Sequence, residues 1–214
     1  INPKKVISIK KDGRYGVSGD ELSMYDIYTE KLKKGHSRDN WLGVLKPFDI
    51  KPNSNVYDLY LTDNLVKKTH NFLKQYSSKL LVGINLEGAV KGKKIRFSEL
   101  YRICQGLYKN NNKIQILILT TPNKFQRVSQ KVINMELNYV AISFKTETIM
   151  AVASVISQLD LIITPDTSIS HIASAFNKPV VTIHENNQES FHLFAPTSSL
   201  NKTVFSTDTN SLDG

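Results

Sequence analysis

The stretch TPDTSISHIASAFNKPVV, residues 164–181, joins two apolar runs through a polar turn and a helix-like segment. The runs on either side of it, residues 159–164 and 179–184, are short and apolar, as buried strands are. Residues 168–176 carry apolar side chains at helical spacing, and Asp166 and Thr167 stand where a strand turns into this helix. The order strand, turn, helix, strand predicts a βαβ unit of a parallel sheet.

The same alternation covers the chain from about residue 80 onward. Strands are expected at 80–86, 114–120, 139–142, 160–164 and 179–184, and helices at 97–108, 123–135, 146–159 and 168–176. Ser98 is expected to cap the first of these helices. Short apolar strands separated by helices are typical of a parallel sheet covered on both faces. The sequence therefore predicts an α/β fold with a doubly wound, Rossmann-like parallel sheet.

The first eighty residues have a less regular pattern. Strands are expected at 6–9 and 56–61, and an amphipathic helix at 63–76 with Asp63 as its cap. The apolar pattern here is too sparse for an independent domain. We therefore expect residues 1–52 to be the end of a preceding α/β domain with its connector, and residues 53–214 to form the Rossmann-like domain.

Composition limits the class of protein. With 214 residues, of which 40% are hydrophobic, the chain is long enough to bury a core. It has no apolar run of membrane-spanning length, and its first ten residues lack the features of a signal peptide, so we expect a cytoplasmic protein. The one cysteine, Cys104, is expected in the core, and no metal site is expected.

The chain is strongly basic. It carries 28 Lys+Arg against 19 Asp+Glu, a formal net charge of +9, which favours anionic partners. Nucleic acid, an anionic membrane surface and phosphorylated small molecules all meet this condition. The lysines form no arginine-rich stripe with stacking aromatic residues, which argues against a nucleic-acid partner.

Three loops follow predicted strands, at the sheet edge where ligands bind in open α/β folds. The first contains Gly88 and Ala89, which permit close backbone approach, and then a basic cluster made up of Lys91, Lys93, Lys94 and Arg96. The second is LTTPNKF, residues 119–125. The third is the opening stretch, where the amides of Thr167, Ser168 and Ile169 are expected to be unpaired donors at a helix N-terminus and so to form an anion site.

The third loop has an alternative interpretation. An aspartate, a threonine and a serine at a helix start are also what an ordinary well-capped helix contains. His171, five residues after Asp166, is expected either to be structural or to reach a ligand oxygen or the aspartate. The combination of three loops on one domain favours the ligand site.

The chain resembles a known family over roughly residues 55–205. The carrying segments are VGINLEGAVKGKKIRFSELYRICQGL, residues 82–107, and IMAVASVISQLDLIITPDTSISHIASAFNKPVVTIHENN, residues 149–187, with FAPT at 194–197. Their most specific element is the Asp-Thr-x-x-x-His turn at residues 166–171, followed by a helix, Lys-Pro and an apolar strand. These segments are similar to the C-terminal half of glycosyltransferase family 9, the lipopolysaccharide heptosyltransferases and their relatives.

The resemblance implies a GT-B architecture, in which two Rossmann-like domains face a cleft and the C-terminal one binds a nucleotide-diphosphate sugar, commonly ADP-heptose. Asp166, Thr167, Ser168 and His171 would take the donor-site positions, and Lys93 or Lys94 that of the lysine at the donor phosphates. The implied reaction is inverting sugar transfer without a metal ion or other cofactor. The implied partners are the nucleotide sugar and a lipid-linked saccharide acceptor, with peripheral contact at the inner face of the cytoplasmic membrane.

The chain departs from the family pattern at four places. Ser168 stands where relatives usually have glycine, and Ile95 stands where a tryptophan often follows the lysine. His184-Glu185-Asn186 replaces a glycine after the final strand. The glutamate expected to hold the ribose is not found in TTPNKF, residues 120–125.

The resemblance also implies that the acceptor domain and the general base of such an enzyme lie outside residues 1–214. The chain alone is therefore expected to bind the donor without transferring sugar. Two alternatives stay open at this point: another GT-B or epimerase-type nucleotide-sugar protein, and a basic α/β module that binds nucleic acid.

Overall fold

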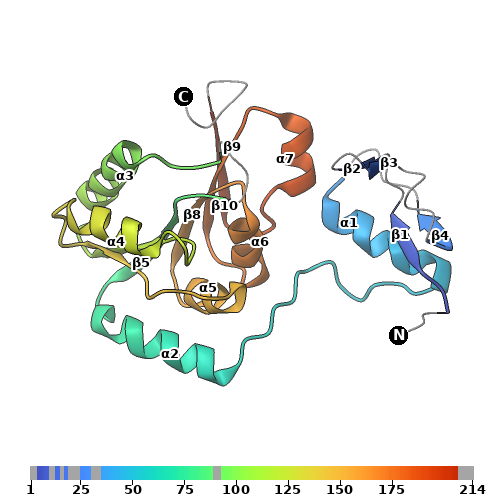
Figure 1. The fold of residues 1–214 in the computed structure, drawn as a ribbon, viewed down its shortest axis with the longest axis horizontal. Helices are drawn as coiled ribbons and strands as arrows, with labels where there is room; N and C mark the ends of the chain where they lie inside the picture. The colour runs from blue at the N-terminus through green and yellow to red at the C-terminus, as the bar shows by residue number, and fades with distance from the viewer. Residues whose placement is uncertain are drawn as a thin grey trace. The chain divides into compact units, whose positions relative to one another are not determined.

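The computed structural model describes residues 4–9, 13–14, 17–18, 25–29, 35–88 and 93–206. The chain forms two compact units, Ile1–Val56 with Gln188–Ala195, and Tyr57–Asn187 with Pro196–Gly214 (Figure 1). Among the described residues, no helix combines the length and the apolar character needed to cross a bilayer. The assignment of residues 1–52 to the end of a preceding domain stays a prediction.

The smaller unit contains short elements. Strands β1 (Ile7–Ile9) and β4 (Ile27–Thr29) pair in parallel, and β2 (Gly13–Arg14) pairs antiparallel with β3 (Val17–Ser18). Helix α1 (Ser37–Leu42) runs into the 3₁₀ helix η2 (Gly43–Phe48), and α7 (Gln188–Phe194) completes the unit. The His36 ring lies at the start of α1, where its Nδ1 accepts from the Arg38 N–H at 3.1 Å and its Nε2 lies 3.0 Å from the carbonyl oxygen of Ala195. This ring therefore joins α1 to the residue that follows α7.

The larger unit is built on a six-stranded, wholly parallel sheet with the order β10-β9-β8-β5-β6-β7. The strands are β5 (Leu80–Asn85), β6 (Ile114–Leu119), β7 (Val140–Ile142), β8 (Leu161–Pro165), β9 (Val180–His184) and β10 (Asn201–Phe205). The helices are α2 (Asp63–Leu73), the short 3₁₀ helix η3 (Lys74–Tyr76), α3 (Phe97–Asn110), α4 (Phe125–Ile133), α5 (Ile149–Ser157) and α6 (Ser168–Ala175).

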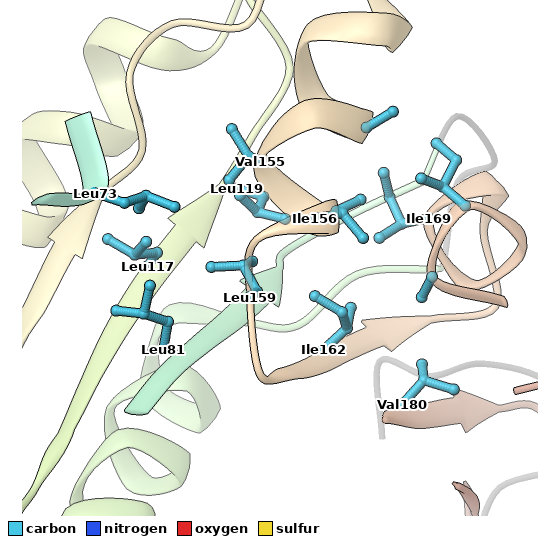
Figure 2. Close-up of a cluster of buried hydrophobic side chains, with 13 residues drawn as sticks. Leu73, Leu81, Leu117, Leu119, Val155, Ile156, Leu159, Ile162, Ile169 and Val180 are labelled. Atoms are coloured by element: carbon cyan, nitrogen blue, oxygen red, sulfur yellow. The ribbon is translucent and has the colours of Figure 1, made fainter. Parts of the chain in front are cut away.

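Helices cover both faces of the sheet. Successive residues of a strand point to opposite faces, so each strand contributes side chains to both apolar clusters. On one face Leu81, Leu117 and Ile162 pack with residues of α2, α5 and α6, as Figure 2 shows. On the other face Val82 and Ile116 pack with residues of α3 and α4. The predicted doubly wound α/β fold is confirmed.

The chain reverses its direction of winding at β5. From β5 it passes through α3 to β6 and through α4 to β7, and then returns through α5 to β8 on the opposite side of β5. The carboxyl ends of β5 and β8 therefore flank the topological switch point, where open α/β sheets bind ligands.

Several local predictions were wrong. Residues 56–61 form no strand. Leu59 and Leu61 instead pack against the cluster around α2 and α5, so the alternating apolar residues are partly buried without pairing in a sheet. Asp63 is the first residue of helix α2 and not its cap; Thr62 holds the N-cap position. Helix α3 begins before Ser98, where the N–H of Arg96 donates to Glu99 Oε2 at 2.8 Å. Helix α7 and strand β10 were not predicted.

We predict that Gly83→Ala and Gly106→Ala change stability with opposite signs. A Cβ on Gly83, in the middle of β5, would lie 2.5 Å from Cδ1 of the fully buried Leu159. We expect overpacking to cost about 1–3 kcal/mol there. A Cβ on Gly106 meets nothing within 4 Å, so alanine in α3 should stabilise by roughly 0.5–1 kcal/mol. Urea denaturation of both variants measures this, and stabilisation at both positions would contradict the packing argument.

Candidate functional site: a cleft at the switch point

A cleft of about 270 Å³ opens at the carboxyl ends of β5, β6 and β8. Its lining residues come from four segments: Asn85, Glu87 and Gly88 after β5; Leu119, Thr120, Thr121 and Pro122 at the end of β6; Thr146, Glu147, Thr148, Ile149 and Val152 at the start of α5; and Thr167, Ser168 and Ile169 at the start of α6. All three loops singled out from the sequence contribute to it. Two helix N-termini therefore meet at one cleft, and each presents the positive end of its dipole.

The start of α6 has a capping residue and also an N–H group without a partner inside the helix. Thr167 is the N-cap, and its Oγ1 accepts from the N–H of Ile169 at 3.2 Å. The amide of Ile169 is therefore not an unpaired donor, which corrects the expectation from sequence. The N–H of Ser168, the first helical residue, has no carbonyl four residues earlier in the helix to bond to. The capped-helix and anion-site interpretations of this turn are thus compatible.

A polar network fixes Thr167 between the two central strands. The buried Asn85, at the end of β5, donates from Nδ2 to Thr164 Oγ1 at 3.0 Å and to Thr167 Oγ1 at 3.3 Å. The hydroxyl oxygens of Thr164 and Thr167 lie 3.1 Å apart. Side chains on β5, on β8 and at the start of α6 are therefore held as one unit. Asn85 and Thr164 were not predicted as site residues, although a polar residue at the end of an apolar strand is a usable signal.

Gly88 is required by Thr167. A Cβ at position 88 would lie 2.6 Å from Thr167 Cγ2 and 3.4 Å from its Cβ. The glycine thus permits the close approach of two loops, and its expected role in donor binding stays a prediction. Ala89, assigned with it, lies outside the described residues.

The basic loop folds back on itself and places Lys93 at Asp166. The N–H of Gly88 donates to the Lys93 carbonyl at 2.9 Å, and the N–H of Ile95 donates to the Leu86 carbonyl at 2.7 Å. Lys93 Nζ then lies 2.5 Å from Oδ2 of Asp166, whose side chain is only 8% exposed. Lys94, the other candidate, is exposed and pairs with Glu87 in an antiparallel bridge. Of the two candidate lysines, Lys93 is therefore the one held at Asp166, and a role at the donor phosphates stays a prediction for both.

His184 lies beside this ion pair. It ends β9 and is 2% exposed, with its Nδ1 4.0 Å from Asp166 Oδ2. Burial lowers the pKa of His184; Asp166 and Glu185 act in the opposite direction, and Lys93 lowers it further. His184 was noted in the sequence only as a departure from the family pattern. The structure places it next to the Lys93–Asp166 pair, where burial favours its neutral form.

His171 contacts Tyr57. It lies on α6, and its ring makes an edge contact with Tyr57 at a centroid distance of 5.8 Å. It is not among the residues that line the cleft. A role for His171 in donor binding stays a prediction.

A parallel sheet with a cleft at its switch point, lined by helix N-termini, defines a doubly wound α/β domain of the ligand-binding type. A model of glycosyltransferase family 9 (heptosyltransferase) matches residues 45–212. The chain belongs to this family.

Solved structures support the fold. The chain is similar to a glycosyl transferase family 9 protein from Veillonella parvula DSM 2008, with a TM-score of 0.72 and 16% identity over 87% of this chain and 53% of that chain. It is similar to E. coli heptosyltransferase WaaC with ADP, with a TM-score of 0.65 and 17% identity over 92% of this chain and 58% of that one. It is also similar to E. coli ADP-heptose lps heptosyltransferase II, with a TM-score of 0.59 and 15% identity over 75% of this chain and 49% of that chain.

The chain thus spans about half the length of these three proteins. Their identities are low, so they establish the fold alone. A comparison with curated proteins found no significant match.

We predict that His184 contributes to acid sensitivity. The lowered pKa means that the unfolded chain takes up a proton on this histidine at a higher pH than the folded chain. The free energy that His184 contributes to folding is therefore fully present above the histidine pKa of the unfolded chain, about 6.5. It is lost as the pH falls below that value. His184→Gln should show a smaller decrease in melting temperature than the parent between about pH 7.5 and pH 5.5. The exposed His70→Gln is the control and should behave as the parent; equal decreases in all three proteins would contradict the assignment.

Proposed function

We propose that the chain is the donor-binding part of a glycosyltransferase that transfers a heptose or similar sugar from a nucleotide-diphosphate sugar to a lipopolysaccharide-type acceptor. The observation that carries this proposal is the cleft at the switch point, which has the N-terminus of α6 in its wall and Lys93 held nearby by Asp166. Membership in glycosyltransferase family 9 favours transfer over the epimerase-type and nucleic-acid alternatives.

The electrostatics of the cleft suit a departing diphosphate. When the bond between sugar and phosphate breaks, negative charge develops on the leaving phosphate oxygen. Preorganised N–H groups at a helix N-terminus and a nearby ammonium group stabilise such charge. In this proposal the N–H of Ser168 and Nζ of Lys93 take that role, so that inverting transfer proceeds without a metal ion or other cofactor.

The remaining residues have separate roles. Asp166 orients Lys93 and contacts sugar hydroxyls, because a carboxylate beside a phosphate would be repelled. The amide of Ile169 is held by Thr167 and shapes the turn. We place the acceptor site and the general base in the part of such an enzyme that this chain does not include, and the whole enzyme at the cytoplasmic face of the inner membrane, where a lipid-linked acceptor is reached. The C-terminal half of a GT-B enzyme is the position we assign to the chain.

The donor site is tested with ADP, the nucleotide named for WaaC. We expect Lys93→Ala to weaken ADP binding by about 10- to 100-fold, the equivalent of one charge-assisted hydrogen bond. Lys94→Ala and the remote, exposed Lys109→Ala should change it by less than about threefold, because exposed charges are screened. Isothermal titration calorimetry measures all three.

Lys93→Ala also leaves the buried Asp166 without its cation, so the fold needs a separate check. The double variant Lys93→Ala/Asp166→Asn removes both charges and should recover thermal stability while ADP binding stays weak. Equal losses of ADP affinity at Lys93 and Lys94, or full recovery of binding in the double variant, would refute the role of Lys93.

We further predict that residues 1–214 bind ADP but transfer no sugar. Transfer needs an acceptor hydroxyl and a base within hydrogen-bond reach of each other. Addition of the complementary domain, in the same chain or as a separate protein, should restore transfer to a lipid-linked saccharide, measured by ADP release from ADP-heptose. Turnover by residues 1–214 alone that disappears in Asp166→Ala would place the base within this chain instead.

A further inference from the structure

A second lysine–carboxylate pair lies at the cleft and has no place in the proposed phosphate contacts. Glu87, in the loop after β5, lines the cleft, and its Oε2 lies 2.5 Å from Nζ of Lys124. Lys124 stands at the start of α4, in the loop after β6. The Glu87 side chain is 17% exposed, so this carboxylate lies mostly inside the protein rather than in solvent.

The chemistry of a carboxylate restricts what Glu87 can bind. An ionised carboxylate only accepts hydrogen bonds, and it repels a phosphate. Its ligand must therefore offer donors. A nucleoside diphosphate carries neighbouring donors in its two ribose hydroxyls, and acidic side chains accept from the ribose in other nucleotide-binding parallel sheets. A carboxylate offers about four lone-pair sites, so the bond from Lys124 leaves capacity for both hydroxyls.

Glu87 is also held in place. Its carbonyl oxygen accepts from Asn85 Nδ2 at 3.1 Å, and the residue pairs with Lys94 in the antiparallel bridge that closes the loop. Lys124 fixes the far end of the side chain. A carboxylate that is fixed at both ends loses little conformational freedom when it binds a ligand.

The other acidic residue in the cleft is a weaker candidate. The Glu147 side chain is 63% exposed and lies 2.8 Å from Nζ of Lys145. An exposed carboxylate such as Glu147 gives up hydrogen bonds to water when it binds a ligand, so the net gain in binding free energy is small. Thr120 also lines the cleft, and its buried Oγ1 has no hydrogen-bond partner among the described residues.

We propose that Glu87 binds the ribose hydroxyls of the donor nucleotide and so makes the site specific for ribonucleotides, with Lys124 as the residue that positions it. This inference rests on the proposed function of the cleft as a donor site. In this arrangement the loop after β5 contributes the carboxylate, and the loop after β6 contributes the lysine that holds it.

The test compares ADP with 2′-deoxy-ADP and 3′-deoxy-ADP by titration calorimetry. The parent chain should bind ADP at least about tenfold more tightly than one of the deoxy nucleotides, the effect of one hydrogen bond to a charged group. Glu87→Gln keeps the size of the side chain but removes its charge, and should bring this ratio close to one. Glu147→Gln is the matched control and should keep the ratio of the parent.

Lys124→Met separates positioning from binding. Loss of the Lys124 ammonium group should reduce the ratio of ADP affinity to deoxy-nucleotide affinity, because Glu87 is no longer held. The double variant Glu87→Gln/Lys124→Met should reduce this ratio no further than Glu87→Gln alone. Melting temperatures without nucleotide show that each variant is folded.

The outcomes are distinguishable. Equal affinity of the parent for ADP and both deoxy nucleotides, or an unchanged ratio in Glu87→Gln, would overturn this inference and leave the donor site standing. A ratio that falls in Glu147→Gln instead would assign the ribose to the other loop. Failure of the parent to bind ADP or any other nucleoside diphosphate would overturn the proposed function itself.

Discussion

The parallel pairing of β5 with β8 is the constraint on which the site depends. The partners Val82 and Leu161, Gly83 and Ile162, and Ile84 and Ile163 lie side by side although about eighty residues separate them. Everything that follows the two strands is then forced together at their carboxyl ends. Glycine at position 83 matters for this pairing, because its missing side chain leaves the space that Leu159 fills directly before β8.

The same pairing organises the charges. Asn85 reaches Thr164 and Thr167, the loop after β5 returns at Lys93, and Lys93 meets Asp166 directly after β8. Glu87 points from the same loop toward the neighbouring loop, where Lys124 meets it. Asp166 and Glu87 thus each have a cation on a different segment of the chain, whereas Glu147 pairs with Lys145 within its own segment. The N-terminal ends of α5 and α6 add positive potential to this cleft, which favours an anionic ligand.

The sequence predicted the sheet well and its local details less well. The runs 80–86 and 114–120 are continuous and apolar because both faces of a central parallel strand are buried, which makes them easy to identify. Strand β10 escaped prediction because it lies at the sheet edge and reads as the mixed sequence NKTVF. Helix α7 has only seven residues, too few for a clear period. Residues 56–61 alternate as a strand does, but they pack against helices instead.

The site was predictable only as far as local sequence determines it. The turn at Asp166 and Thr167 and the lysine pair at 93 and 94 have local signatures. No periodicity could choose Lys93 over Lys94, because that choice depends on which of two neighbouring side chains the loop directs to Asp166. The contact of Gly88 with Thr167, the burial of His184 and the pair of Glu87 with Lys124 likewise depend on strand order and register.

In the proposed donor site, the Lys93–Asp166 pair serves ligand binding more than stability. Removing two charges from water costs free energy that their attraction only partly returns, so a buried ion pair adds little to the stability of a fold. An apolar pair in the same place would serve the sheet equally well. The ammonium group, however, has three N–H donors, and Asp166 accepts from one of them. The pair therefore fixes the direction of the lysine and leaves donors for a phosphate oxygen, so an anion can bind without breaking the contact that orients its partner.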